Sequence, residues 1–230
     1  MLGRGRAPRE EDPYTAAWAA LTQPRIRTFY SRFEVDLNRP PEQAVYLKPE
    51  DSWGLQVWRE PPEPACIAAS LEAYKDFYAG VEKELREIER RHGLFVLLDI
   101  HNYNHRREGP DQPPADPDKN PEINIGTASC NLELWGPLID RFIGDFRNFD
   151  FQGRSLDVRE NVKFLGGNLS RWVHRSFPES GLALAVEFKK IFMDEWSGEL
   201  DVAIHRALGE ALASTFPGLR ASLKAMGARP

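Results

Sequence analysis

The stretch LFVLLDIH, residues 94–101, decides the fold of this 230-residue chain. It is an almost unbroken apolar run preceded by Gly93, which is typical of a strand that helices cover on both faces. Immediately before it, residues 66–91 place apolar side chains at three- and four-residue spacings, with Glu and Lys between them. That spacing predicts an amphipathic helix that ends at Gly93. His101 is therefore expected where a central strand ends.

The same alternation of strand and helix patterns continues on both sides of this stretch. A second buried-strand pattern, GLALAVEFKKIFM, covers residues 181–193. Further strands are predicted at residues 26–36, 122–126 and 156–161, and further helices at 14–21, 132–146 and 201–226, the last interrupted at Phe216-Pro217-Gly218. Residues 106–121 are rich in Pro, Asp and Gly, which indicates a long loop of the kind that often carries function.

Recurrence of strand, crossover helix and strand favours an α/β fold. We expect a three-layer α/β/α arrangement of phosphorylase/hydrolase-like type, with a mostly parallel, mixed central sheet. The length fits one domain over residues 1–230, in which residues 1–11 lack periodicity and are expected to be flexible. In such sheets ligands bind outside the carboxyl ends of the strands.

Composition narrows the class of protein. Apolar residues make up 41% and charged residues 28%, which is ordinary for a folded soluble domain. A net charge of −5 gives no positive field for nucleic acid or an anionic membrane, so neither is an expected partner. The two cysteines, Cys66 and Cys130, form no CxxC pair, and no signal peptide or membrane-spanning run is evident. We therefore expect a cytoplasmic protein; the sequence carries no signal for an oligomeric state.

Two residues carry the strongest chemical signals. Metal-assisted amide hydrolysis needs imidazole or carboxylate ligands and a carboxylate that takes a proton from water. His101 is a candidate ligand, and Asp99, two residues earlier on the same strand face, is placed to orient its ring. On pattern alone, a strand-end histidine is more often structural. Glu187 interrupts an apolar strand, which suits a general base and a buried ion pair equally well.

The remaining candidates have weaker signals. Asn38 and Arg39 follow the predicted strand at 26–36 and offer an amide and a guanidinium fork for a carboxylate, while Arg32 is a candidate oxyanion stabiliser. Each of these residues is also ordinary for a strand or its exit. The last candidates, which more often belong to turns or to satisfied structural positions, are Gly166, Gly167 and His174.

Five segments in order resemble the N-formylglutamate amidohydrolase family, in particular its poorly characterised branch. They are SRFEVDLNR (31–39), FVLLDIHNYNHRR (95–107), INIGT (123–127), VKFLGG (162–167) and LAVEFKKIFMDEW (184–196). The likeness runs from about Glu10 to Glu199. The DLNR and DIHN segments are also similar to those of aspartoacylases and, more distantly, zinc carboxypeptidases, which share an α/β/α fold.

The resemblance implies a role for each main candidate. His101 matches a zinc-ligating histidine, Glu187 the general base and acid, and Arg32 the arginine that polarises the carbonyl. Asn38 with Arg39 matches the anchor for a substrate carboxylate, to which we add Gly166, Gly167 and His174 as candidate substrate-binding residues.

The sequence departs from this pattern at its start. The related enzymes take another histidine ligand from a loop after their first strand, and this chain begins after that segment. By the resemblance, Asp12 or Glu11 is the candidate replacement ligand, with Asp12 preferred, although Glu10-Glu11-Asp12 is also an ordinary helix start. The departure leaves two explanations, a start assigned too far downstream or a member that has lost part of its site.

The sequence thus predicts a hydrolase that cleaves the amide bond of a small N-acyl, N-formyl-type amino acid by metal-activated water. The expected cofactor is zinc, with other divalent metals compatible with the same ligands. The expected partner is a small molecule that bears a carboxylate. Two alternatives stay open: a non-catalytic descendant that binds a ligand or protein through an incomplete metal site, and a peptidase for small peptides.

Overall fold

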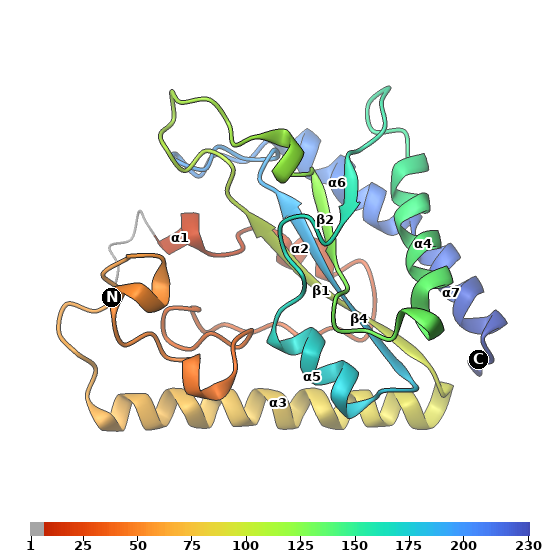
Figure 1. Ribbon diagram of the computed structural model, residues 1–230, viewed down its shortest axis with the longest axis horizontal. Helices are drawn as coiled ribbons and strands as arrows, with labels where there is room; N and C mark the ends of the chain where they lie inside the picture. The colour runs from red at the N-terminus through yellow and green to blue at the C-terminus, as the bar shows by residue number, and fades with distance from the viewer. Residues whose placement is uncertain (1–6) are drawn as a thin grey trace.

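A mixed four-stranded sheet forms the centre of the protein. The computed structural model describes residues 7–230. The strands are β1 (Phe95–Tyr103), β2 (Ile123–Gly126), β3 (Val158–Glu160) and β4 (Gly181–Lys189), in the spatial order β1-β4-β2-β3. The pairs β1–β4 and β2–β3 are parallel, whereas β2 pairs with β4 in the antiparallel sense. The predicted mostly parallel, mixed sheet is therefore confirmed (Figure 1).

Helices cover both faces of this sheet. They are α1 (Ala7–Glu10), α2 (Thr15–Ala19), α3 (Pro64–His92), α4 (Leu132–Asn148), α5 (Asn168–Ser176), α6 (Val202–Ser214) and α7 (Phe216–Ala225), with short 3-10 turns at Pro41–Gln43, Pro49–Ser52 and Pro117–Lys119. The predicted break in the closing helix is confirmed, because α6 ends before Thr215 and α7 has Pro217 in its first turn.

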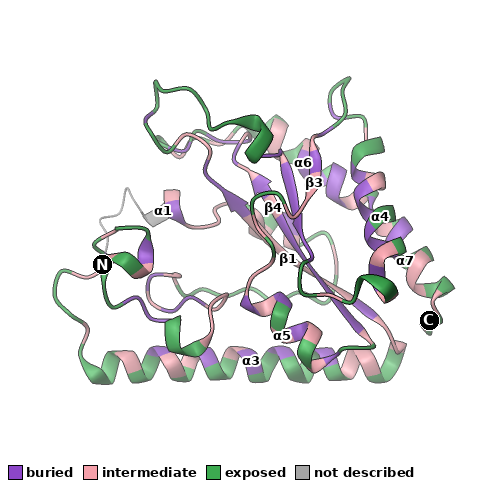
Figure 2. Ribbon diagram, viewed as in Figure 1, coloured by how far each residue is buried: buried purple, intermediate pink, exposed green. Residues whose placement is uncertain are grey.

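The side chains of β4 alternate between two helical layers. Leu182, Leu184, Val186 and Phe188 face the larger core, which they share with α2, α4, α6 and α7. Ala183 faces the smaller core, which it shares with α3 and α5. Figures 1 and 2 show this arrangement, with the buried strands between α3 and α5 on one side and α4 and α7 on the other. The three-layer α/β/α prediction is confirmed.

The strand predicted at residues 26–36 is absent, and this prediction was wrong. Residues 25–29 have no regular structure and residues 32–34 form a turn, in which Glu34 and Val35 donate to the carbonyl of Ser31. Phe33 packs in a small cluster with Tyr46, and Val35 packs against α3. The two-residue spacing of Phe33 and Val35 therefore comes from their burial in these loop clusters and not from a strand of the sheet. Asn38 and Arg39 therefore lie in a loop and not at a strand end.

The beginning of the chain differs from its prediction in part. Residues 1–6 of the expected flexible segment lie outside the described residues. Residues 7–10 form α1, and Glu10 is buried at 6% exposure. The segment thus joins the folded domain before Asp12.

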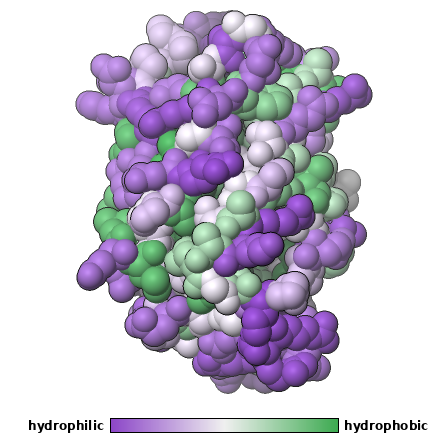
Figure 3. All heavy atoms as spheres, turned by 90° about the vertical axis from the view of Figure 1, so that its right-hand side faces the viewer, coloured by the Kyte–Doolittle hydropathy of each residue, from purple (hydrophilic) through white to green (hydrophobic). Residues whose placement is uncertain are grey.

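Both polar and apolar side chains reach the surface on the face drawn in Figure 3. On the face that carries α4 and α7, hydrophilic side chains alternate with smaller hydrophobic areas (Figure 3). Within residues 7–230, no helix combines the length and the apolar character that crossing a membrane requires.

Candidate functional site

A cavity of about 250 Å³ opens at the carboxyl ends of β1 and β4. Its wall includes eight of the nine residues proposed from the sequence: Asp12, Arg32, Asn38, Arg39, His101, Gly166, Gly167 and Glu187. They come from loops, strands and a helix start that lie far apart in the chain. Only His174 is outside the cavity wall.

The pairing of β1 and β4 places His101 beside Glu187. The two residues are partners in the parallel register, as are Asp99 and Ala185 two positions earlier. Because side chains alternate along a strand, Asp99, His101 and Glu187 share the sheet face that packs against α5. Small residues of β4 lie on this face beneath α5. The carboxylate and imidazole side chains lie further along the strands, beyond the part that α5 covers.

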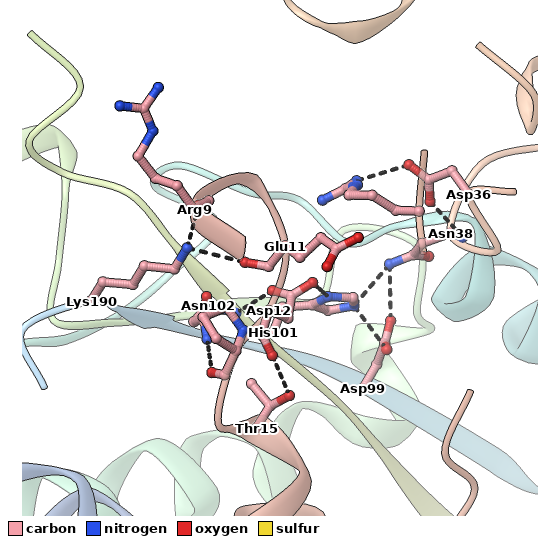
Figure 4. Close-up of polar contacts among 12 residues, drawn as sticks. Arg9, Glu11, Asp12, Thr15, Asp36, Asn38, Asp99, His101, Asn102 and Lys190 are labelled. Carbon is pink, nitrogen blue, oxygen red and sulfur yellow. Dashed lines mark hydrogen bonds and ion pairs between the residues drawn. The ribbon is translucent and has the colours of Figure 1, made fainter. Parts of the chain in front are cut away.

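His101 lies between two carboxylates (Figure 4). Its Nδ1 is 3.3 Å from Asp12 Oδ2, and its Nε2 is 2.9 Å from Asp99 Oδ1. Burial alone lowers the pKa of an imidazole, but the charges of Asp99 and Asp12 outweigh it and raise the pKa of His101 well above its usual value.

Asn38 is engaged on both sides of its amide. Its Nδ2 is 3.2 Å from Asp99 Oδ2 and 3.0 Å from His101 Nε2, and its Oδ1 accepts the backbone N–H of Leu169 at 2.9 Å. Because that N–H requires an oxygen, the amide orientation is fixed. With Nε2–H donating to Asp99, Asn38 donates to the second oxygen of the same carboxylate. Asn38 therefore helps to orient His101 through Asp99.

Asp12 is held at the free edge of the sheet. β1 is an edge strand, and the outward-facing N–H of Asn102 donates to Asp12 Oδ1 at 2.7 Å. Burial raises the pKa of Asp12, but the charge and hydrogen bond of His101 outweigh this effect and lower it to about 2. Asp12 is thus an ionised carboxylate that faces Nδ1 of His101.

Glu187 is the other carboxylate at the centre of the cavity. Among the described residues its side chain makes no hydrogen bond and no ion pair, so the buried ion pair considered from the sequence is not formed there. Burial raises its pKa to about 7, with the charge of His101 opposing the shift and those of Asp12 and Asp99 adding to it. A carboxyl group of this kind exchanges protons near neutral pH.

Arg32 and Arg39 share one buried carboxylate on the cavity wall. Arg32 Nη2 is 2.8 Å and Arg39 Nε is 3.7 Å from Oδ2 of Asp36, which also accepts a hydrogen bond from Tyr46. The two guanidinium groups lie 5.0 and 5.7 Å from the ring centre of Trp53. Two cations on one carboxylate leave a net positive charge facing the cavity. Arg32 Nε is buried and has no partner among the described residues.

Helices α3 and α5 hold the loop that carries Asn38 and Arg39. Tyr78 and Tyr74 donate to the carbonyls of Leu37 and Arg39 at 2.8 and 2.9 Å. The side-chain amide of Asn168 donates to the hydroxyl oxygen of Tyr74 at 3.0 Å and to that of Tyr78 at 2.8 Å. The helical spacing explains why the tyrosines look like core residues in the sequence, whereas their hydroxyl groups fix the loop.

Gly167 allows this loop to approach α5 closely. A Cβ atom at Gly167 would overlap the amide of Asn38. Gly166 has a φ of +110°, which favours glycine. The close neighbour of Gly167 is thus the residue that orients His101.

His174 has a structural environment. Its Nε2 accepts the backbone N–H of Ala183 at 3.0 Å, and its Nδ1 is 2.7 Å from Ser129 Oγ. Nδ1 must therefore carry the proton in the neutral ring, which leaves no basic nitrogen to activate the serine. Burial lowers the pKa of His174 to about 4.

The sequence reasoning missed several residues of the cavity wall. They include Asn102, Asn104, Arg107 and Lys190. Lys190 is 1% exposed, and its ammonium group contacts the chain around Glu10. The only signal for these residues was their position inside the segments 95–107 and 184–196, which the resemblance already covered.

The donor set fits two positions of a zinc site. Two ligands of one tetrahedral zinc, each bonded at about 2.0–2.2 Å, lie roughly 3.4 Å apart. The separation of His101 Nδ1 and Asp12 Oδ2 is 3.3 Å, with Asp99 on the opposite ring nitrogen as an orienting carboxylate. Within residues 7–230, no group of three His, Cys, Asp or Glu side chains is arranged around one such point.

Solved structures with a similar fold include a named amidohydrolase. The crystal structure of N-formylglutamate amidohydrolase from Ralstonia eutropha JMP134 superposes with a TM-score of 0.71, covering 96% of this chain and 85% of that one at 16% identity. The gene product Atu2144 from Agrobacterium tumefaciens gives a TM-score of 0.52 at 21% identity, covering 83% of this chain and 69% of that one. At these identities the likeness shows the fold.

The sequence itself matches a family. No functionally curated protein matched the chain. The family model for N-formylglutamate amidohydrolase matches residues 2–193, a span that contains all of the cavity-wall residues discussed above. This chain therefore belongs to the N-formylglutamate amidohydrolase family.

Proposed function

We propose that this protein hydrolyses the amide bond of small N-acyl amino acids of the N-formyl type. The observation that carries the proposal is the placement of Glu187 beside His101 at the carboxyl ends of β1 and β4, opposite a cationic wall. Membership of an amidohydrolase family supports the reaction class. A cavity of about 250 Å³ lies below the usual range of about 300–1,000 Å³ for ligand sites, which favours a small substrate.

His101 and Asp12 are the proposed zinc ligands. Asp99 accepts the Nε2 proton of His101, which leaves the lone pair of Nδ1 for the metal. When bound, zinc lowers the pKa of a coordinated water to about 7 and thereby provides a nucleophile at neutral pH. Other divalent metals are compatible with the same pair.

Glu187 is the proposed base and acid. It accepts the proton of the attacking water and returns it to the leaving amine, and its raised pKa suits both transfers. Arg32, which lines the cavity, is the proposed partner of the oxygen that becomes negative during attack. Arg39, already poised over the rings of Tyr46 and Trp53, is the proposed anchor for the substrate carboxylate.

A substrate panel tests this function against its rivals. Purified protein supplied with zinc is offered N-formyl and N-acetyl amino acids, their methyl esters and small peptides, and release of the free amine is followed. We expect turnover of the N-formyl compounds that keep a free carboxylate. Preference for peptides would support the peptidase instead. Binding without turnover of any compound would support a non-catalytic descendant.

A further inference from the structure

Asp12 lies in a segment that is not part of the sheet. Residues 9–12 run beside the free edge of β1, outside the sheet order β1-β4-β2-β3. At the rim of the cavity, Glu10 pairs with Arg107 at 3.0 Å and Arg9 lies 4.2 Å from the ring centre of Trp196. These contacts fasten side chains. Thr15 Oγ1 and Asn102 Nδ2 donate to the carbonyls of Asp12 and Pro13 at 2.9 and 2.8 Å, so the backbone that still needs a contact is the stretch before Asp12.

Lys190 makes that contact. It follows the last residue of β4, and its backbone N–H continues the pairing by donating to the carbonyl of Tyr103 at 3.0 Å. Its Nζ donates to the carbonyls of Arg9 at 2.6 Å and Glu11 at 3.0 Å, and to Asn104 Oδ1 at 2.8 Å. All three ammonium protons therefore have acceptors within the protein, and none is left for a substrate.

The chemistry of this contact is unusual for a purely structural lysine. The residue is 1% exposed, and no carboxylate of the described residues lies within ion-pair distance of its Nζ. Removing an ammonium group from water is costly unless other groups compensate. The backbone carbonyls of Arg9 and Glu11 accept hydrogen bonds from the ammonium group and provide that compensation. The charge of Lys190 therefore holds one particular stretch of backbone.

We propose that Lys190 is a positioning residue that fixes Asp12 against His101. Its ammonium group clamps the backbone at residues 9–11 to the end of β4, the strand that also carries Glu187. The clamp keeps the Asp12 carboxylate 3.3 Å from His101 Nδ1 and 2.7 Å from the N–H of Asn102. The expected effect of Lys190 on catalysis rests on the proposed function, whereas its effect on the position of Asp12 does not.

The first test measures position without activity. The outward N–H of Asn102 has the Asp12 carboxylate as its acceptor, so its hydrogen exchange reports whether Asp12 is docked. We expect Lys190→Met and Asp12→Ala each to speed this exchange by about tenfold or more, while core amides of β4 stay protected. The matched control is Lys189→Met, because Lys189 contacts the carbonyl of Asn120 at 2.7 Å instead. Unchanged Asn102 exchange in folded Lys190→Met overturns the proposal.

The second test asks whether Lys190 acts through Asp12. Wild type, Lys190→Met, Asp12→Asn and the double variant are compared on the best N-formyl substrate. We expect Lys190→Met to lower kcat by about tenfold with little change in KM, and to cause less than about twofold further loss when Asp12 is already replaced. Equal losses in both backgrounds overturn the proposal. Lys190→Gln, which keeps an amide donor, replaces the methionine variant if the latter does not fold.

The two tests separate the two proposals. If the wild type hydrolyses no N-acyl amino acid, the proposed function fails, and the exchange of the Asn102 amide still decides whether Lys190 positions Asp12.

Discussion

The acidic run at residues 10–12 shows how far residue type alone predicts the role of a side chain. From the sequence, Asp12 or Glu11 is a candidate ligand within the acidic run Glu10-Glu11-Asp12. In the structure Glu10 pairs with Arg107, Glu11 accepts a hydrogen bond from Ser31, and Asp12 faces His101. Residue type alone cannot choose among neighbouring acids, because the choice depends on distant partners, which lie 20 positions away for Glu11 and 89 positions away for Asp12.

Arg39 provides a test at this scale. Arg39→Ala removes a charge-assisted contact to the substrate carboxylate, which is worth about 1.5–3 kcal/mol, or roughly 10- to 100-fold in KM. We expect this increase for N-formyl amino acids with a free carboxylate and almost none for their methyl esters. Equal effects on acid and ester, measured by steady-state kinetics, would assign Arg39 a structural role.

His174 provides a test that is independent of activity. The pKa of His174 is about 4 in the folded protein and about 6.5 in an unfolded chain, so the unfolded state binds more protons between these pH values. Its contribution to the free energy of unfolding is complete above pH 6.5 and is lost as the pH falls toward 4. In His174→Gln, urea titrations should give a flatter dependence of stability on pH over this window. Parallel curves for both proteins would contradict the buried neutral ring.

At the scale of elements, the pattern of apolar residues was sufficient to predict the sheet and its main helices. The runs at 94–101 and 181–193 became β1 and β4, and the spacing at 66–91 became α3. The predicted strand at 26–36 failed because its alternation was partial and its two buried side chains pack in loop clusters. The neighbouring edge of β1 is instead bordered by the segment of Asp12, a contact that has no periodic signature.

The junction of α5 with the Asn38 loop is the element most sensitive to a small change. In Gly167→Ala the added methyl group must displace the Asn38 amide, which is fixed by Asp99 and Leu169. We expect a loss of about 1–3 kcal/mol in the free energy of unfolding and a strong fall in kcat, because Asn38 orients His101 through Asp99.

A second glycine gives the control for this prediction. At Gly80, inside α3, an added Cβ meets no atom within 4 Å. Gly80→Ala should therefore stabilise the protein by about 0.5–1 kcal/mol and leave kcat unchanged. If Gly167→Ala behaves like Gly80→Ala in both measurements, the close approach of Asn38 does not matter for the site.

At the scale of the whole molecule, the site assembles from segments that meet only in the fold. The rule for parallel sheets placed His101 at the ligand-binding edge, the interruption of an apolar strand singled out Glu187, and the resemblance gave roles to Arg32, Arg39 and Asp12. The positions of Lys190, Asn102 and the Tyr74–Tyr78–Asn168 network required the structure, because hydrogen bonds across up to 181 positions leave no local pattern. His174, for which the sequence favours a satisfied structural position, lies outside the cavity, and its ring nitrogens bond to Ala183 and Ser129.

The central claim is that this cavity hydrolyses an amide with Glu187 as its proton carrier. The most direct measurement is the rate of formate release from N-formylglutamate by zinc-supplied wild type and by Glu187→Gln. We predict steady release by the wild type and a rate lower by about 10²–10⁴-fold in the variant, with unchanged metal content and stability. Equal rates in the two proteins, or no release by the wild type, would contradict the claim.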